Sequence, residues 1–353
     1  MKTSITVQKS RAAASGDATA TKAGRAPSAS KTARASRDAK VAPADQIAGL
    51  TLTRPDKLYF PEAGITKRDL ARYVETMAPW ILPHLTDRPL TLVRCPDGWA
   101  GQCFYQRHAD PSVAAAVSRI EVPEGDGTAL YMGANSAEAL VALVQWGVLE
   151  LHPWASRRPR LNRPDRVIFD FDPDDGVAWA ELAAAARMLR TLLQRLELQG
   201  FLKTTGGKGL HVVVPIRADQ SWSESKDFAK AVAEFMARSF PDRFTAVLSK
   251  SRRAGKIFID YLRNAESATA VAPYSVRARA NAPVATPIEW DELAKEVRFD
   301  HFNLRNVPAR VKGGKDPWRE FGAVKQSLRT AHSKLVGMDP AAVGAVGHRR
   351  TNE

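Results

Sequence analysis

Two aspartates stand two positions apart near the middle of the sequence, in the run Val167-Ile168-Phe169-Asp170-Phe171-Asp172-Pro173. Side chains alternate between the faces of a strand, so we expect Phe169 and Phe171 on one face and Asp170 and Asp172 on the other. Two carboxylates with Cα atoms about 6–7 Å apart repel each other, and burial increases that cost. A pair of divalent cations removes the repulsion and can hold both oxygens of an in-line phosphoryl displacement. The alternative is an exposed strand end with two solvated acids.

A third aspartate lies in another β-rich run, Lys256-Ile257-Phe258-Ile259-Asp260-Tyr261. The alternation places Asp260 on the face opposite Ile257, Ile259 and Tyr261. An acid in an otherwise apolar strand needs a partner. Two partners are open for Asp260: a metal ion shared with the first two acids, or a nearby arginine in a buried ion pair.

The run Thr205-Gly206-Gly207-Lys208-Gly209-Leu210-His211 is a candidate phosphate-binding turn. Glycines let the backbone approach a ligand closely, and successive N–H groups can form an anion-binding nest. Lys208 adds a positive charge, Thr205 a hydroxyl donor, and His211 a ring N–H for a triphosphate oxygen. The spacing is not that of a Walker A loop, and a strand follows instead of a helix. A hairpin turn with a solvated lysine is the alternative.

These residues need helices and strands to position them. Thr66 has the character of a helix N-cap, and apolar residues then recur at helical spacing. Further helices are predicted at 136–146, 177–198 and 224–239. Strands are predicted at 90–94, 166–171, 211–216 and 256–261. The mixture indicates an α/β or α+β fold with a substantial sheet.

The composition is that of a globular protein with a basic surface. Of the 353 residues 44% are hydrophobic, and the net charge of +14 favours a polyanionic partner, either nucleic acid or acidic lipid. We find neither an apolar run long enough to span a membrane nor a secretory signal. A basic, Ser-rich start also fits a transit peptide. Cys95 and Cys103 match no zinc pattern, so we expect two buried thiols and a reducing interior.

The order of the acid and glycine motifs resembles the three-motif catalytic core of the archaeo-eukaryotic primase superfamily. Other motifs between about 50 and 330 are similar to the polymerase domain of bacterial ligase D, an enzyme of non-homologous end joining. These motifs are Leu52-Thr53, Pro55-Asp56-Lys57, Gly64-Ile65-Thr66-Lys67, Arg94 with Pro96-Asp97-Gly98, Phe104-Tyr105-Gln106-Arg107-His108, His152-Pro153-Trp154, and Pro273-Tyr274-Ser275 with Arg277.

The resemblance implies an α+β primase-polymerase fold, with mixed and antiparallel central sheets flanked by helices. It implies that two divalent cations, Mn²⁺ or Mg²⁺, are held by the catalytic acids Asp170, Asp172 and Asp260. Contacts to a nucleoside triphosphate are implied for Thr205, Gly206, Gly207, Lys208, His211 and Arg277. A pocket for the 5′-phosphate of a DNA end falls on Lys57 and Lys67. Stacking near the template falls on Phe104 and Tyr105, and a basic loop falls on Lys250, Arg252 and Arg253.

Three positions depart from the family pattern. Thr205 stands where the family usually has Ser and keeps the hydroxyl. Tyr105 stands where Phe is usual and keeps a stacking face. Arg54 stands where Asn is usual, beside the lysine of the first motif, and we expect it to alter the 5′-phosphate pocket.

We expect three parts along the chain: a disordered basic arm at 1–45, the polymerase domain at 46–335, and a frayed tail at 336–353. The expected partners are DNA ends with a 5′-phosphate, NTP or dNTP, Ku and a DNA ligase, in the cytoplasm at the nucleoid. The chain would act as a monomer or a transient end-synapsing dimer. A stand-alone primase-polymerase and a non-catalytic end-bridging module are the alternatives. We find no ligase-type K-x-D-G site.

Overall fold

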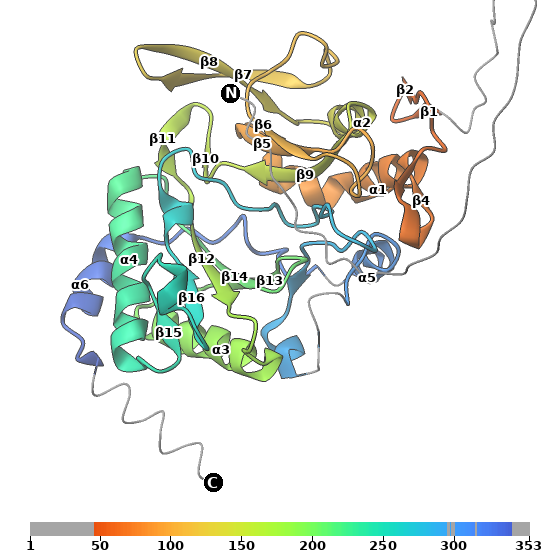
Figure 1. Ribbon diagram of the computed structural model, residues 1–353. Coiled ribbons are helices and arrows are strands. Elements are labelled where there is room, and N and C mark those ends of the chain that lie inside the picture. The colour runs from red at the N-terminus through yellow and green to blue at the C-terminus, as the bar shows by residue number, and fades with distance from the viewer. Residues whose placement is uncertain (1–45, 295–296, 298–300, 315, 341–353) are drawn as a thin grey trace, which may run out of the picture.

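The computed structural model describes residues 46–294, 297, 301–314 and 316–340. Two sheets lie one above the other in Figure 1, with α1 and α2 beside the upper sheet and α3 and α4 beside the lower one. The arm predicted at 1–45 and the last part of the predicted tail, 341–353, lie outside the described residues. In the part of the chain that is described, no helix is both long and apolar enough to cross a membrane.

The first sheet is built around β5 (Leu90–Arg94), which pairs antiparallel with β6 (Phe104–Gln106) and β9 (Val148–Pro153). A long hairpin of β7 (Ser118–Glu124) and β8 (Gly127–Gly133) extends it. The helices of this half are α1 (Lys67–Leu85), α2 (Ala137–Gln145) and, later in the chain, α5 (Val307–Lys312). Short strands form three hairpins: β1 (Gln46–Ile47) with β2 (Leu50–Thr51), β3 (Leu58–Phe60) with β4 (Ile65–Thr66), and β10 (Ser156–Arg157) with β11 (Arg160–Pro164).

The second sheet has six strands in the order β15-β16-β12-β14-β13-β17. They are β12 (Arg166–Pro173), β13 (Phe201–Thr204), β14 (Leu210–Pro215), β15 (Phe244–Thr245), β16 (Ile257–Asp260) and β17 (Pro287–Ile288). Every pair is antiparallel except β15 with β16. Its helices are α3 (Trp179–Arg195), α4 (Trp222–Ser239) and α6 (Leu328–Val336), and short 3-10 turns lie at Pro61–Ala63, Lys250–Arg252, Leu262–Asn264 and Trp290–Ala294. The predicted α+β fold with mixed and antiparallel sheets is confirmed.

Local sequence explains where these elements begin and which face they bury. Thr66 caps α1: its hydroxyl accepts from the Asp69 N–H, and the Asp69 carboxylate accepts from the Thr66 N–H. The apolar stripes of α1, α3 and α4 are all buried. In β12, Phe169 and Phe171 point into the main core, while Ile168 packs on the opposite face of the sheet.

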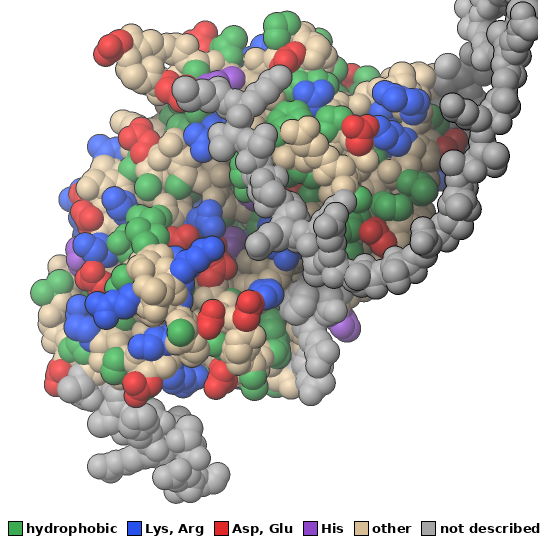
Figure 2. Space-filling model, viewed as in Figure 1, with side chains coloured by type: hydrophobic (Ala, Val, Ile, Leu, Met, Phe, Trp, Pro, Cys, Tyr) green, Lys and Arg blue, Asp and Glu red, His purple; other side chains and the backbone are tan. Residues whose placement is uncertain are grey.

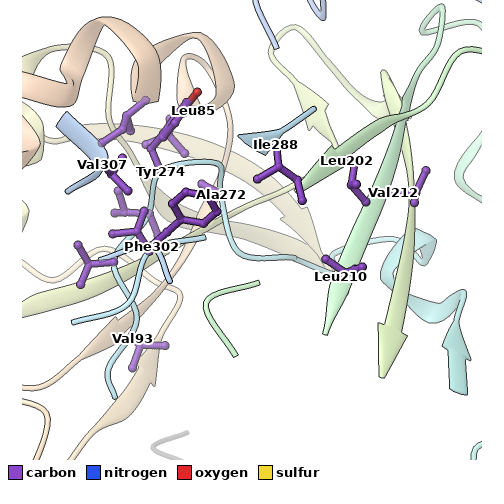
Figure 3. Close-up of a cluster of buried hydrophobic side chains, with 14 of the residues drawn as sticks. Leu85, Val93, Leu202, Leu210, Val212, Ala272, Tyr274, Ile288, Phe302 and Val307 are labelled. Atoms are coloured by element: carbon purple, nitrogen blue, oxygen red, sulfur yellow. The ribbon is translucent and has the colours of Figure 1, made fainter. Parts of the chain in front are cut away.

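The two sheets are joined by residues 269–286, which we name the connecting segment. Its backbone bonds to both sheets, because the Ala272 N–H donates to the Leu151 carbonyl of β9 and the Thr286 carbonyl accepts from the Thr204 N–H of β13. Figure 3 shows Ala272 and Tyr274 of this segment among apolar side chains from both halves of the molecule. The hydrophobic core therefore runs continuously from the α1 side to the second sheet.

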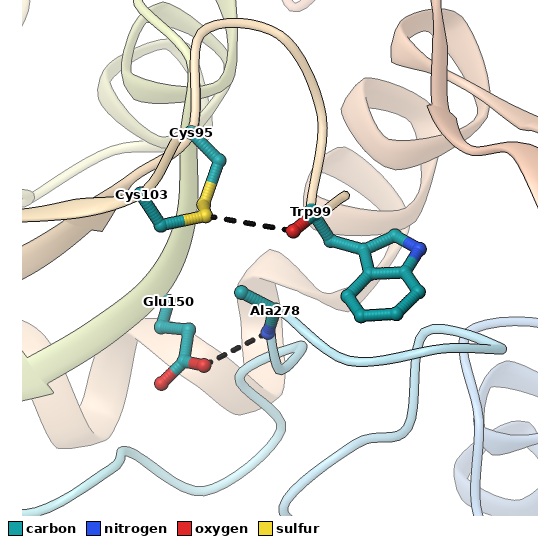
Figure 4. The surroundings of a disulfide bond; sticks show 5 residues. All are labelled: Cys95, Trp99, Cys103, Glu150 and Ala278. Carbon is teal, nitrogen blue, oxygen red and sulfur yellow. Dashed lines mark hydrogen bonds between the residues drawn. A yellow bond between two sulfur atoms is a disulfide. The ribbon is translucent and has the colours of Figure 1, made fainter. Parts of the chain in front are cut away.

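The expectation of two free thiols is wrong, because Cys95 and Cys103 form a disulfide with Cα atoms 4.3 Å apart (Figure 4). The reason lies in the strand register. Arg94 of β5 pairs with Phe104 of β6, so the next residue outward on each strand also faces its counterpart. The loop between them returns the two cysteines to one place, which their spacing alone does not reveal.

Candidate active site

The three aspartates line one cavity of about 690 Å³. Asp170 and Asp260 are directly paired across β12 and β16, and Asp172 lies two residues further along β12. Asp170 and Asp260 are buried, whereas Asp172 lies exposed at the cavity mouth. Figure 2 shows a hollow between the two sheet regions, with acidic, basic and histidine side chains gathered around it. The sheet register thus brings together acids that are ninety residues apart in the sequence (170 and 260).

Arg263 holds two of the acids together. Its Nε lies 3.0 Å from Asp170 Oδ2 and 3.4 Å from Asp260 Oδ2, and Asp260 Oδ1 also accepts from the Leu262 N–H. His211 Nε2 lies 3.2 Å from the other oxygen of Asp170. Of the two alternatives open for Asp260, the ion pair with a nearby arginine is therefore present.

The charges in the cavity shift the pKa of each acid differently. Burial would raise the pKa of Asp170, but His211 and Arg263 outweigh it and hold the pKa well below its usual range. Burial and the neighbouring charge of Asp170 raise the pKa of Asp172 to about 6. Burial, followed by the Lys203 charge, lowers the pKa of His211 to about 4, so its ring is neutral and donates from Nε2.

The donor set of the cavity suits a hard divalent cation. Mg²⁺ and Mn²⁺ prefer carboxylate oxygens, and a cation between the acids removes the repulsion that raises the pKa of Asp172. Among the described residues, however, no three acidic, histidine or cysteine side chains stand in a ready-made ligand cluster. Arg263 supplies the positive charge between Asp170 and Asp260. A cation held by Asp170 and Asp260 would have to displace this guanidinium.

The glycine turn lies on the same cavity, between β13 and β14. Thr205 Oγ1 donates to the Gly209 carbonyl and accepts from the Gly207 N–H, so the hydroxyl closes the turn. Gly206 has a φ of +64°, and a Cβ at Gly209 would lie 2.5 Å from the Phe171 carbonyl oxygen. Both positions therefore require glycine. Lys208 is exposed and forms an ion pair with Asp175.

Arg277 reaches the turn from the connecting segment. Its Nη1 donates to the Thr205 carbonyl, and its Nε donates to Glu150 Oε2 at 2.9 Å. Burial would raise the pKa of Glu150, but Arg277 and His152 outweigh it and hold the pKa at about 2. The same Glu150 oxygen lies 2.8 Å from His152 Nε2. A buried carboxylate thus holds the guanidinium against the turn.

Lys57 and Lys67 lie side by side where β3 meets the start of α1, and the Lys67 N–H donates to the Lys57 carbonyl. Lys57 Nζ contacts Asp97 Oδ1 and the Pro96 carbonyl at 2.7 Å, and Lys67 Nζ donates to the Thr53 carbonyl. Burial, followed by the charges of Arg54 and Lys57, lowers the pKa of Lys67 to about 8. Three cationic side chains therefore share this corner, outside the cavity of the acids.

Of the predicted aromatic pair, Tyr105 lines the cavity and Phe104 does not. Tyr105, on the edge strand β6, is 46% exposed, lines the cavity and meets the His152 ring edge-on at 6.5 Å. Phe104 lies on the other face of β6, near the Arg94 guanidinium. The basic loop precedes β16: its residues Lys250 and Arg252 are exposed, and Arg253 stacks on the Phe258 ring.

Sequence reasoning missed two residues that line the cavity, Arg263 and Arg279, and it missed Glu150, which bonds to the cavity residue Arg277. Arg263 follows Asp260 by three positions, a spacing that can form an ion pair across a tight turn. Glu150 precedes His152 by two positions in an otherwise apolar strand, which places both on one face. That alternation was the available signal.

A sequence profile described as "LigD, primase-polymerase domain" matches residues 66–318. The multifunctional non-homologous end joining protein LigD of Pseudomonas aeruginosa is 39% identical over 292 residues, which is 82% of this chain and 35% of that protein. The bifunctional LigD of Bacillus subtilis is 27% identical over 274 residues, 77% of this chain and 44% of that protein.

Among solved structures, the polymerase domain of Mycobacterium tuberculosis ligase D in complex with DNA aligns with a TM-score of 0.74 and 34% identity. The alignment covers 78% of this chain and 98% of that one. The chain spans less than half of the length of the LigD proteins named above. With the profile covering most of the described residues, the chain belongs to the LigD primase-polymerase domain family, a family of DNA-directed nucleotidyltransferases.

Proposed function

We propose that the chain extends the 3′ end of a DNA strand by template-directed addition of nucleotides, and that it fills or extends broken ends in bacterial non-homologous end joining. The observation that carries this proposal is the meeting of Asp170, Asp172 and Asp260 with the glycine turn on one cavity. Acids that can hold cations, placed beside phosphate-binding groups, are what transfer of a nucleotidyl group requires.

Asp170, Asp172 and Asp260 would hold two divalent cations, Mn²⁺ or Mg²⁺. Bound there, such cations lower the pKa of the attacking 3′-hydroxyl and neutralise the triphosphate and the leaving pyrophosphate. The other roles belong to the chain itself. The Gly207 and Lys208 region and Arg277 bind the triphosphate, and the buried strands β12 and β16 keep the acids in register.

The DNA end is bound by contacts that carry no sequence preference. Lys57 and Lys67, with Arg54 beside them, would take the 5′-phosphate, and Lys57 would exchange its contact with Asp97 for that phosphate. Tyr105 presents an exposed ring at the cavity edge on which a template base can stack. Lys250, Arg252 and Arg253 add phosphate affinity beside the acids. Such contacts suit breaks of any sequence.

The partners proposed beyond DNA and nucleotide are Ku and a DNA ligase. Support comes from relatives named as non-homologous end joining proteins and from the structural neighbour that is bound to DNA. The net charge of +14 is consistent with a nucleic-acid partner.

A primer-extension assay with Mn²⁺ and either NTP or dNTP tests the proposal. The unaltered chain should lengthen a primer on its template, and Asp170→Ala should abolish this. Asp87→Asn is the control, because Asp87 is a partly exposed acid paired with Arg158 outside the cavity. Extension by Asp170→Ala at the rate of the control would refute the proposal. A template without primer separates end extension from priming.

A further inference from the structure

Glu150 is a buried carboxylate on strand β9, and both of its oxygens are used. Its residue is 5% exposed. Oε2 accepts from Arg277 Nε at 2.9 Å and lies 2.8 Å from His152 Nε2. Oε1 accepts from the Ala278 N–H at 2.8 Å (Figure 4). A carboxylate this far from solvent is costly unless it is paired. Glu150 therefore fixes the backbone and the side chain of the connecting segment at one point.

From Glu150 the contacts continue to the glycine turn. Arg277 uses Nε for Glu150 and Nη1 for the Thr205 carbonyl, so its side chain is held at both edges. A Cβ on Gly206 would lie 2.8 Å from Arg277 Cγ, which shows how closely the turn packs on the arginine stem. A guanidinium has five N–H donors, so this use of two leaves others to face the cavity that Arg277 lines.

We propose that Glu150 is a positioning residue for the nucleoside triphosphate: it orients Arg277, and through Arg277 it sets the shape of the turn Thr205–Gly209. The inference rests on the proposed function of this cavity. Glu150 contacts neither the acids nor the turn itself within the described residues, so its effect is indirect. It belongs to the first sheet, whereas the turn belongs to the second.

Loss of the Glu150 charge should affect nucleotide binding more than the chemical step. Without the charge of Glu150, Arg277 is a largely buried cation with no carboxylate partner, and it turns toward solvent or another acceptor. The Thr205 carbonyl then loses its donor, and the turn loses its support. The acids stay in place because their register depends on β12 and β16. The nucleotide KM should therefore rise while kcat changes little.

The test is steady-state primer extension by the full chain, with nucleotide and primer-template varied separately. Glu150→Gln keeps the shape and removes the charge. We expect its nucleotide KM to rise about tenfold, as the loss of one charge-assisted hydrogen bond predicts. The expected change in kcat is less than about threefold, and the apparent Kd for primer-template should be unchanged. Glu150→Asp keeps the charge, so its nucleotide KM should lie between those of the unaltered chain and Glu150→Gln.

A matched control is Glu292→Gln, the same substitution at a partly buried glutamate that pairs with Arg310 away from the cavity. It should lower Tm without raising the nucleotide KM. A double-mutant cycle isolates the coupling: in an Arg277→Ala background, Glu150→Gln should add no further rise in KM.

Three results would overturn the inference while leaving the proposed function intact, since the unaltered chain still extends primers. They are an unchanged nucleotide KM in Glu150→Gln, an equal rise in Glu292→Gln, and the same rise with and without Arg277. If Glu150→Gln does not fold, Glu150→Asp carries the same cycle, and an unchanged KM in that variant is the contrary result. A chain that never extends primers would instead refute the proposed function.

Discussion

Asp165 pairs with a group of three arginines near the start of β12, and its removal should give a measurable loss of stability. Arg88, which is fully buried, and Arg157 both contact Asp165 Oδ2, while Arg166 Nε lies 3.2 Å from Oδ1. Arg88 and Arg166 have almost no exposed surface, so their charges depend on this carboxylate. Asp165→Asn keeps the shape of the side chain but removes the negative charge that pairs with these guanidinium groups.

The expected cost at neutral pH is about 3–5 kcal/mol, the usual cost of breaking a buried ion pair from one side. Burial would raise the pKa of Asp165, but Arg88 and Arg166 outweigh it and hold the pKa well below its usual range. A folded-state pKa below the unfolded value means that the stabilisation is fully present above the unfolded pKa, about 4, and is lost as the pH falls below it. The difference between the unaltered chain and Asp165→Asn should therefore shrink below about pH 4.

Urea unfolding followed by circular dichroism at several pH values between 3 and 8 measures this difference. Asp87→Asn is the control: its pair with Arg158 spans 3.2 Å between two partly exposed side chains, and such pairs contribute about 0–1 kcal/mol. Two results would contradict the assigned role. One is a free energy of unfolding for Asp165→Asn within about 1 kcal/mol of that of the unaltered chain at pH 7. The other is a difference in this free energy that stays constant down to pH 3.

Three further predictions concern single substitutions. Lys67→Ala should weaken binding to DNA ends with a 5′-phosphate about tenfold in a fluorescence assay and leave ends with a 5′-hydroxyl unaffected. Lys203→Met should raise Tm at pH 7, because burial, followed by the Arg277 charge, lowers the pKa of Lys203 to about 7. Its folded-state pKa lies below the unfolded value, so the cost of the buried amine is full below pH 7 and the gain in Tm should fade toward pH 10. Gly209→Ala should abolish primer extension, because the added Cβ would lie 2.5 Å from the Phe171 carbonyl oxygen. Gly176→Ala is the control and should leave extension unchanged, because, apart from its chain neighbours, no described residue has an atom within 4 Å of its Cβ.

Local pattern predicted the elements that carry the site. The strand at Leu90–Arg94 and the cap at Thr66 lie where the sequence placed them, and the helix predicted at 177–198 is Trp179–Arg195. Such features depend on the alternation or periodicity of neighbouring residues, so a single segment contains the information. The acids were found the same way, as polar residues interrupting apolar strands.

What the sequence did not reveal depends on register between distant strands. The disulfide of Cys95 and Cys103 follows from the pairing of β5 with β6, and the contact of Arg263 with Asp170 follows from the pairing of β12 with β16. Glu150 is the clearest case, since its partner Arg277 comes from a segment without regular structure, 127 residues later. No pattern within either segment encodes that contact.

The position of the cavity explains why one sheet alone would not make this site. The acids and the glycine turn come from the second sheet, whereas His152 and Tyr105 come from the first. The connecting segment holds the halves together by main-chain bonds to β9 and β13 and by a buried Tyr274 with a φ of +64°. A non-glycine residue in that conformation is strained, and its hydroxyl and carbonyl are bonded to Asp316 and Tyr73. The packing that tolerates this strain also joins the two walls of the cavity, because the same segment bonds to β9 and β13.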